Sequence, residues 1–317
     1  MPLTHAPPCL LYFDDEADAA QRLADAASLA PAAIARHRFP DGELKLRLPA
    51  ALPGRVVLLR SLAQPNEKLI ELLLAARTAR TLGARHLTLV APYLAYMRQD
   101  IAFLPGEAVS QRIIGQFLAS LFDAIITVDP HLHRIAALEE AVPVRQAIVL
   151  SGAPLLGDWI AQRRPHAFLM GPDGESAQWV AQAAARHGLD HAVCRKVRNG
   201  DKAVDIMLPP VNIQGRAVVL LDDVASSGHT VARAAQLLRA AGAASVDVAV
   251  THALFAGDAL QVIRDAGVAE VWSTDCIAHP SNAVRVAPVI SRALHRLWED
   301  SARPASRQAG AANLPPP

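Results

Sequence analysis

The chain has 317 residues, more than one hydrophobic core usually organises, so its length predicts two domains. Its 31 Lys and Arg residues nearly balance its 30 Asp and Glu residues. The formal charge of +1 gives no reason to expect a nucleic acid or an anionic membrane as partner. The three cysteines form no C-x-x-C pair, which argues against a disulfide scaffold or a structural zinc site. No apolar stretch reaches the roughly 18 residues of a membrane helix, and Met1 to Phe13 lacks a signal-peptide pattern, so we expect a cytoplasmic protein.

Short apolar runs alternate with segments of helical period along the chain. The expected strands are Cys9–Phe13, Val56–Arg60, Leu87–Ala91, Ala124–Val128, Ala167–Met170, Val218–Leu221, Val246–Val250 and Val271–Ser273. The expected helices are Asn66–Leu82, Ser110–Leu121, Glu175–His187 and Thr230–Ala241. Two hairpin-like segments, Ile34–Leu48 and His191–Leu208, interrupt the alternation. Strand–helix–strand order with nearly continuous apolar strands predicts an α/β fold with mostly parallel sheets flanked by helices.

The alternation occurs twice, which predicts where the two domains divide. We expect a first domain over residues 1–150 and a second over residues 151–288, with the boundary near Ser151. A last helix within residues 289–300 is expected to pack back on the first domain. Residues 301–317 are rich in Pro, Ala, Ser and Gly, a composition typical of a disordered tail.

The most informative segment runs from Val218 to Thr230 and reads V-V-L-L-D-D-V-A-S-S-G-H-T. An apolar strand carries Asp222 and Asp223 to the end of the sheet, where open α/β sheets bind ligands. A loop of small residues then opens a helix, and its amides can hold a phosphate; the loop residues are Ser226, Ser227, Gly228, His229 and Thr230. The two acids suit ribose hydroxyls or a nearby Mg²⁺. The alternative is that the acids merely cap a helix and that the glycine forms a turn.

This segment resembles the phosphoribosyl-binding loop of the type I phosphoribosyltransferase fold. Five other motifs occur in order: F-P-D-G-E at 39–43, P-Y-L-A-Y-M-R-Q-D at 92–100, V-D-P-H-L-H at 128–133, G-P-D-G-E-S at 171–176 and R-K-V-R at 195–198. The ordered set resembles the ribose-phosphate pyrophosphokinases (PRPP synthetases), and is closer to their archaeal-type members. The resemblance implies two tandem phosphoribosyltransferase-like domains of the Rossmann-like kind. It also implies a homo-oligomer that uses ATP, ribose 5-phosphate and Mg²⁺.

By this resemblance, several residues of the first domain contact ATP. Phe39, Asp41 and Glu43 hold the adenine, usually from a neighbouring subunit, and their aromatic face and carboxylates suit that role. Arg98 and Gln99 contact ATP, and the arginine fork fits phosphate oxygens. His131 binds Mg²⁺ or an ATP phosphate. The alternatives are a plain hairpin turn at Asp41 and, for the H-x-H pair, a zinc site or a structural loop histidine.

The remaining motifs imply metal and charge-neutralising residues in the second domain. Asp173 is a second metal ligand or ribose contact, and Glu175 and Ser176 stand where the commoner pattern has glycines. Lys196 and Arg198 neutralise charge during transfer, and Arg198 also contacts ribose 5-phosphate. Ser226 replaces a common Asp, and His229 replaces a common Gly. A solvated basic strand is the alternative for Lys196 and Arg198.

The implied activity is that of a ribose-phosphate diphosphokinase. It would transfer the β,γ-diphosphoryl group of ATP to the C1 hydroxyl of ribose 5-phosphate, giving 5-phospho-α-D-ribose 1-diphosphate (PRPP) and AMP. Two other functions stay open. A base phosphoribosyltransferase would consume PRPP with the same loop but would not need the F-P-D-G-E and R-Q-D motifs. A non-catalytic regulatory paralogue would not need Lys196, Arg198 and His131.

Overall fold

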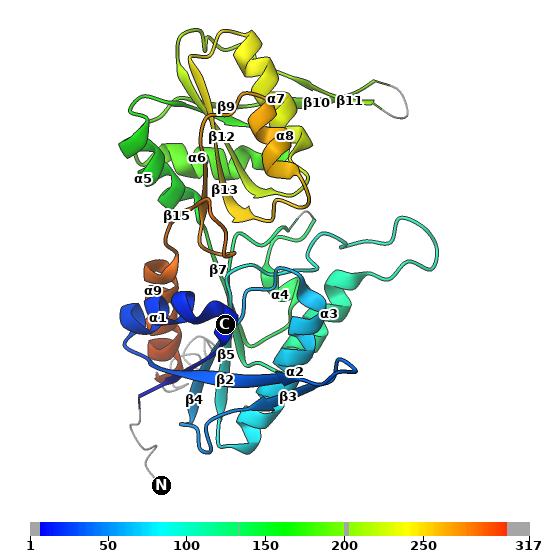
Figure 1. Cartoon of the computed structure of the whole chain (residues 1–317), viewed down its shortest axis with the longest axis vertical. Coiled ribbons are helices and arrows are strands. Elements are labelled where there is room, and N and C mark those ends of the chain that lie inside the picture. The colour runs from blue at the N-terminus through cyan, green and yellow to red at the C-terminus, as the bar shows by residue number, and fades with distance from the viewer. Residues whose placement is uncertain (1–6, 133, 200–202, 303–317) are drawn as a thin grey trace, which may run out of the picture.

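The computed structural model describes residues 7–132, 134–199 and 203–302. These residues form two α/β units that follow one another along the long axis of the molecule, each built on its own sheet (Figure 1). The predicted α/β fold class, with mostly parallel sheets between helices, is confirmed. The two units contribute different halves of the site described below, so their sheets are described in turn.

The first sheet has strand order β3-β2-β1-β4-β5-β6-β7. Its strands are β1 (Cys9–Phe13), β2 (Ala30–Arg38), β3 (Leu44–Arg47), β4 (Arg55–Leu59), β5 (His86–Ala91), β6 (Ala124–Val128) and β7 (Gln146–Leu150). Neighbouring strands are parallel except for β2 and β3, which form the expected antiparallel hairpin. The order reverses between β1 and β4, so the chain builds outward from these central strands in both directions.

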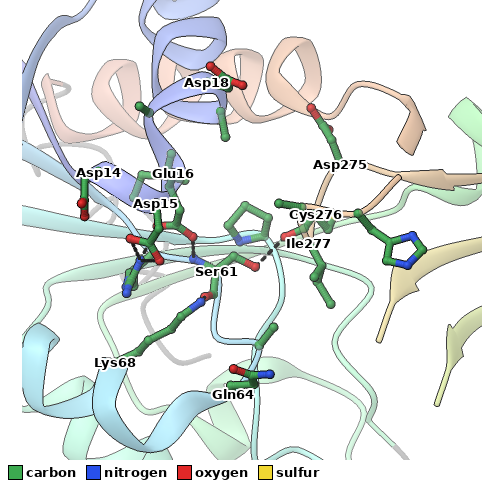
Figure 2. A pocket seen from close by; sticks show the side chains of 18 of the residues that line it. Asp14, Asp15, Glu16, Asp18, Ser61, Gln64, Lys68, Asp275, Cys276 and Ile277 are labelled. Carbon is green, nitrogen blue, oxygen red and sulfur yellow. Dashed lines mark hydrogen bonds and ion pairs between the residues drawn. The ribbon is translucent and has the colours of Figure 1, made fainter. Parts of the chain in front are cut away.

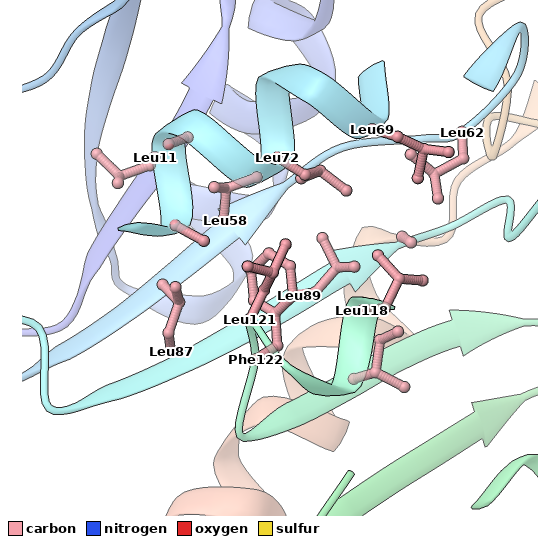
Figure 3. Close-up of a cluster of buried hydrophobic side chains, with 14 of the residues drawn as sticks. Leu11, Leu58, Leu62, Leu69, Leu72, Leu87, Leu89, Leu118, Leu121 and Phe122 are labelled. Carbon is pink, nitrogen blue, oxygen red and sulfur yellow. The ribbon is translucent and has the colours of Figure 1, made fainter. Parts of the chain in front are cut away.

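Helices cover both faces of the first sheet. They are α1 (Ala17–Ala27), α2 (Pro65–Thr81), α3 (Ser110–Ala119) and the short α4 (Leu138–Ala141). Leucines of α2 and α3 pack on Leu58, Leu87 and Leu89 of the sheet (Figure 3). On the other face, α1 packs beside the last helix, α9 (Ala287–Ala302). Because Leu294 of α9 lies in the same buried cluster as Leu10 of β1, the chain's final helix belongs to the core of the first sheet.

The second sheet has strand order β15-β14-β13-β12-β8-β9. Its strands are β8 (Phe168–Gly171), β9 (His191–Val193), β12 (Ala217–Ala225), β13 (Ser245–Ala253), β14 (Val271–Thr274) and β15 (Asn282–Val284). One face is covered by α5 (Ala153–Arg163) and α6 (Ala177–Ala185), and the other by α7 (His229–Ala240) and α8 (Ala259–Asp265). All pairs in this sheet are parallel, as its nearly continuous apolar strands predict.

A two-stranded hairpin, β10 (Arg195–Asn199) and β11 (Ala203–Met207), projects from the second unit (Figure 1). Its strands pair antiparallel, which confirms the second expected hairpin. Between the units, β7 ends at Leu150 and α5 begins at Ala153. The predicted tail lies outside the described residues from position 303 onward.

Candidate functional site

A cavity of about 290 Å³ lies at the carboxyl ends of β8 and β12. The order of the second sheet reverses between these strands, and open α/β sheets bind ligands at such reversal points. Its polar lining comes from both domains: Arg98, His131, Asp173, Glu175, Lys196, Asp222, Asp223, Ser226, Ser227 and Thr230. The structure therefore brings five of the six motifs to one place, although those motifs span more than a hundred residues of chain.

The loop after β12 has the geometry of an anion-binding loop. Gly228 precedes the first residue of α7 and has φ +76°, a conformation that L side chains rarely adopt. A Cβ there would lie 2.9 Å from Ala259 O. Both the backbone conformation and this short distance therefore exclude any residue with a side chain. No side chain caps this start of α7, which leaves its N-terminal amides to an anion. His229 instead lines a separate groove, so its main-chain amide, not its imidazole, adjoins the loop.

Three carboxylates crowd the floor of the cavity. Asp222 and Asp223 lie in the last part of β12, and Asp173 follows β8 and lines the same cavity. Burial, and then the charges of Asp223 and Asp173, raise the pKa of Asp222 well above its usual value. A cation bound among these groups would relieve that repulsion, so the donor set fits a divalent metal. Mg²⁺ commonly uses one or two protein carboxylates together with substrate phosphates.

His131 reaches this floor from the first domain. Its Nδ1 donates to Asp223 Oδ2 at 2.6 Å. Because a carboxylate accepts, Nδ1 is the donor in this hydrogen bond, so Nε2 is the ring nitrogen that could bind a metal. Across the described residues, no group of three or more His, Cys, Asp or Glu stands close enough to hold a metal by itself. His133, the second histidine of the H-x-H pair, lies outside the described residues, so the zinc alternative for that pair stays open.

Asp129 holds the loop that carries His131, and the sequence does not indicate this role. Asp129, two residues earlier, is buried and has φ +36°, unusual for a residue other than glycine. Its Oδ2 accepts from Gly152 N at 2.8 Å and from Thr251 Oγ1 at 2.7 Å, and its Oδ1 accepts from Trp179 Nε1 at 3.0 Å. These donors belong to the second unit, so one carboxylate fastens the loop of the first domain to three elements of the second.

Lys196 reaches the cavity from the start of β10. Its Nζ lies 2.5 Å from Asp173 Oδ2. Burial lowers the pKa of Lys196, but the hydrogen bond and charge of Asp173, helped by Glu175 and Asp222, raise it overall. The ammonium is therefore charged and directed at the carboxylates. The side chain of Arg198, two residues further along β10, lies outside the described residues.

The residues predicted to contact ATP divide into two sets. Arg98 lines the cavity, and Gln99 lies next to it, its side chain accepting from Ser110 Oγ at 3.2 Å. Phe39, Asp41 and Glu43 lie in the turn between β2 and β3. Figure 1 shows this hairpin toward the opposite end of the molecule from β10 and β11. None of these three residues lines the cavity of its own chain.

A larger cavity of about 1070 Å³ lies where the first sheet reverses its order, at the ends of β1 and β4 (Figure 2). Its charges are largely paired within the protein. The buried Arg60 contacts Asp15 at 2.8 Å and Glu16 at 3.2 Å, and Lys68 Nζ donates to Ser61 O at 2.6 Å. Of the described residues that line it, only Pro92 belongs to one of the motifs, and none is a predicted site residue. Volume alone therefore does not identify the reaction site.

Comparisons with known proteins agree with this geometry. A family model described as the N-terminal domain of ribose phosphate pyrophosphokinase matches residues 9–121, and a phosphoribosyl transferase domain model matches residues 152–278. The chain is 34% identical to the ribose-phosphate pyrophosphokinase of Methanopyrus kandleri, a match that covers 87% of this chain and 95% of the relative. It is 36% identical to ribose-phosphate pyrophosphokinase 1 of Archaeoglobus fulgidus, which covers 81% of this chain and 89% of the relative.

Among solved structures, the phosphoribosylpyrophosphate synthetase from Mycobacterium smegmatis has the same fold. The two structures superpose with a TM-score of 0.80 at 22% identity, covering 93% of this chain and 100% of the other. The resemblance seen in the motifs is thus confirmed over both halves of the chain. In the described part of the chain, no helix is long and apolar enough to cross a membrane.

Proposed function

This chain belongs to the ribose-phosphate pyrophosphokinase family, and from that premise we propose that it makes PRPP and AMP from ATP and ribose 5-phosphate. One observation supports this reaction above the alternatives. A single cavity joins the phosphoribosyl loop of the second domain to Arg98 and His131 of the first. A base phosphoribosyltransferase has no need of such residues from another domain.

Ribose 5-phosphate would bind with its phosphate in the loop Ser226–Thr230. The amides of the loop and of the start of α7 donate to the phosphate, and Gly228 lets it approach the backbone. Asp222 and Asp223 accept hydrogen bonds from the ribose hydroxyls. This arrangement directs the C1 hydroxyl toward the first domain, where Arg98 and His131 would align the ATP phosphates.

In the reaction, the C1 oxygen forms a bond to the β-phosphorus of ATP, and the bond from that phosphorus to the bridging oxygen of the α-phosphate breaks. AMP leaves with the bridging oxygen, and the hydroxyl proton passes to solvent. Such transfer depends mainly on alignment and on neutralising the charge that develops. Lys196 and Arg198 supply positive charge from the hairpin side, and Arg98 supplies it from the first domain.

Members of this family use a metal ion, and we propose Mg²⁺ for this chain. His131 and Asp173 would hold it, with Asp222 close by. When bound, the ion would offset the negative charge of the substrate phosphates. The raised pKa of Asp222 supports this assignment, because burial and then the charges of Asp223 and Asp173 raise it, and a bound cation would offset both effects.

We also propose a homo-oligomer in which Phe39, Asp41 and Glu43 complete the ATP site of a neighbouring copy. Phe39 is 38% exposed, so its ring is accessible to an adenine bound at a neighbouring copy. The position of this turn, remote from its own cavity, supports the same proposal. A cytoplasmic location remains a prediction from the sequence.

An assay with ATP, Mg²⁺ and ribose 5-phosphate tests the proposed function. We expect AMP and PRPP in equal amounts by phosphorus NMR, and no AMP when ribose 5-phosphate is left out. A second reaction containing PRPP and a nucleobase should release no diphosphate. Nucleotide formation in that second reaction would favour a base phosphoribosyltransferase. Inactivity in both reactions would favour the regulatory paralogue.

A further inference from the structure

The turn after β8 presents a second carboxylate at the mouth of the cavity. Asp173 Oδ1 accepts from Glu175 N at 2.9 Å, and Ser176 Oγ donates to Asp173 O at 2.6 Å. Ser176 is fully buried, and a Cβ at Gly171 would lie only 2.2 Å from its hydroxyl oxygen. The backbone of Glu175 is therefore fixed relative to Asp173, and its side chain lines the same cavity as Lys196.

Two cations compete for Asp173. Its Oδ2 holds the Lys196 ammonium at 2.5 Å, and it is also a proposed metal ligand. An ammonium at that distance would stand next to a divalent ion, and like charges that close repel in a partly buried site. This repulsion favours a position of Lys196 away from Asp173 when the metal binds. The side chain of Lys196 is 41% exposed, so it has room to move.

Glu175 is well placed to receive the displaced ammonium. It follows Asp173 by two residues on a fixed turn, and its charge already acts on Lys196 in the structure. Building on the proposed function, we propose that Glu175 is a positioning residue that holds Lys196 at the mouth of the cavity once Asp173 binds the metal. Lys196 then stays directed at the diphosphate during transfer. Glycine, which the commoner motif has at this position, could not do this.

A double-mutant cycle of Glu175→Gln and Lys196→Ala tests the contact. In the presence of Lys196, Glu175→Gln should lower kcat roughly five- to twentyfold, the scale of coupling between residues in contact. The KM for ribose 5-phosphate should change less than about twofold, because the loop that binds it is untouched. Without Lys196, the same substitution should have no further effect. Glu175→Asp, which keeps the charge, should recover part of the loss.

Glu270→Gln is the matched control, because it removes an exposed carboxylate of the same domain that lies outside the cavity lining. It should leave kcat unchanged. If the losses of kcat, expressed as free energies, were additive in the variant that carries both Glu175→Gln and Lys196→Ala, the proposal would be overturned. An effect of Glu175→Gln on KM alone would also overturn it.

A titration of the free protein with Mg²⁺ alone, followed by calorimetry, needs no turnover. Lys196→Ala should bind Mg²⁺ more tightly, because Asp173 no longer has to release an ammonium. Glu175→Gln should weaken binding roughly three- to tenfold when Lys196 is present and less than about twofold when it is absent. If Glu175→Gln weakened binding equally in both backgrounds, Glu175 would be a metal ligand and the proposal would be wrong. Because Mg²⁺ binding is measured without turnover, this cycle tests the role of Glu175 even if the assay above finds no AMP.

Discussion

At the scale of single residues, Lys196 is the side chain on which the mechanism depends most. If its ammonium acts mainly on charge formed during transfer, Lys196→Ala should lower kcat and kcat/KM together. We expect a loss of roughly 10²–10³-fold, the scale seen when one preorganised donor to a transition state is removed. Lys196→Arg should recover only part, because a planar fork does not replace a point charge. Steady-state kinetics, with circular dichroism to confirm folding, measures this.

Arg195→Ala is the natural control for that experiment. Arg195 precedes Lys196 on β10, and alternate residues of a strand face opposite sides. Its removal deletes one exposed charge from the same hairpin and should leave kcat within about twofold. Equal losses in the two variants would assign the effect to the general charge of the hairpin.

The individual site residues were predictable to different degrees. Asp173, Lys196 and Asp222 belong to motifs whose residue types match their chemistry, and the structure places all three in one cavity. Trp179 and Thr251, which hold Asp129, lie in segments that read as ordinary helix and strand. Their role arises only where the two domains meet. A contact between residues so distant in the chain leaves no local pattern to recognise.

Among the elements, the loop that starts α7 makes the most specific prediction. Gly228→Ala would place a methyl group against Ala259 O and would also strain the positive φ. Strain of about 1–3 kcal/mol is typical of such positions, so the KM for ribose 5-phosphate should rise roughly tenfold or more. The KM for ATP should change less than about threefold.

Gly257→Ala provides the comparison for this loop. Gly257 also has a positive φ of 62°, but no atom stands within 4 Å of its hypothetical Cβ. The substitution should therefore impose similar backbone strain without a clash and leave both KM values near those of the wild type. A similar rise in the two KM values for Gly228→Ala would argue against a phosphate-binding role.

Helix α2 carries two acids, Glu71 and Glu67, that allow a buried ion pair to be compared with a more exposed one. Glu71 is fully buried and contacts the buried Arg60 at 2.5 Å, whereas Glu67, one turn earlier, is exposed and contacts Arg38. Removing one partner of a buried pair leaves an uncompensated charge, so Glu71→Gln should lower the free energy of unfolding by about 3 kcal/mol. Glu67→Gln should leave it unchanged within error. Denaturant titration of the two variants would reveal the difference, and equal effects would contradict it.

Two helices, α1 and α5, do not appear among the elements that the sequence predicts. Each has only 11 residues, so each offers few turns in which a helical period can be recognised. Helix α5 also contains Gly157, which lowers helix propensity but lets the backbone approach Ala183 O, only 2.1 Å from where a Cβ would lie. Packing against α6, not local preference, determines this helix.

At the scale of the whole molecule, the predicted oligomer makes activity depend on concentration. If the β2–β3 turn completes a neighbour's site, specific activity should fall on dilution in step with dissociation. Light scattering and activity measured on the same dilution series would show the two transitions together. A monomer with full activity would contradict the prediction.

The remoteness of the β2–β3 turn from its own cavity also has a consequence for genetics. Each complete site would contain the β2–β3 turn of one copy and Lys196 of another. When chains with a defective turn are mixed with chains that lack Lys196, some sites should therefore receive neither defect. Phe39→Ala and Lys196→Ala chains, each nearly inactive alone, would form hybrids in which one site receives both defects and another receives neither. In a randomly mixed dimer, activity should return to about a quarter of the wild-type value. Two loss-of-function alleles of this gene would then complement one another within a single cell.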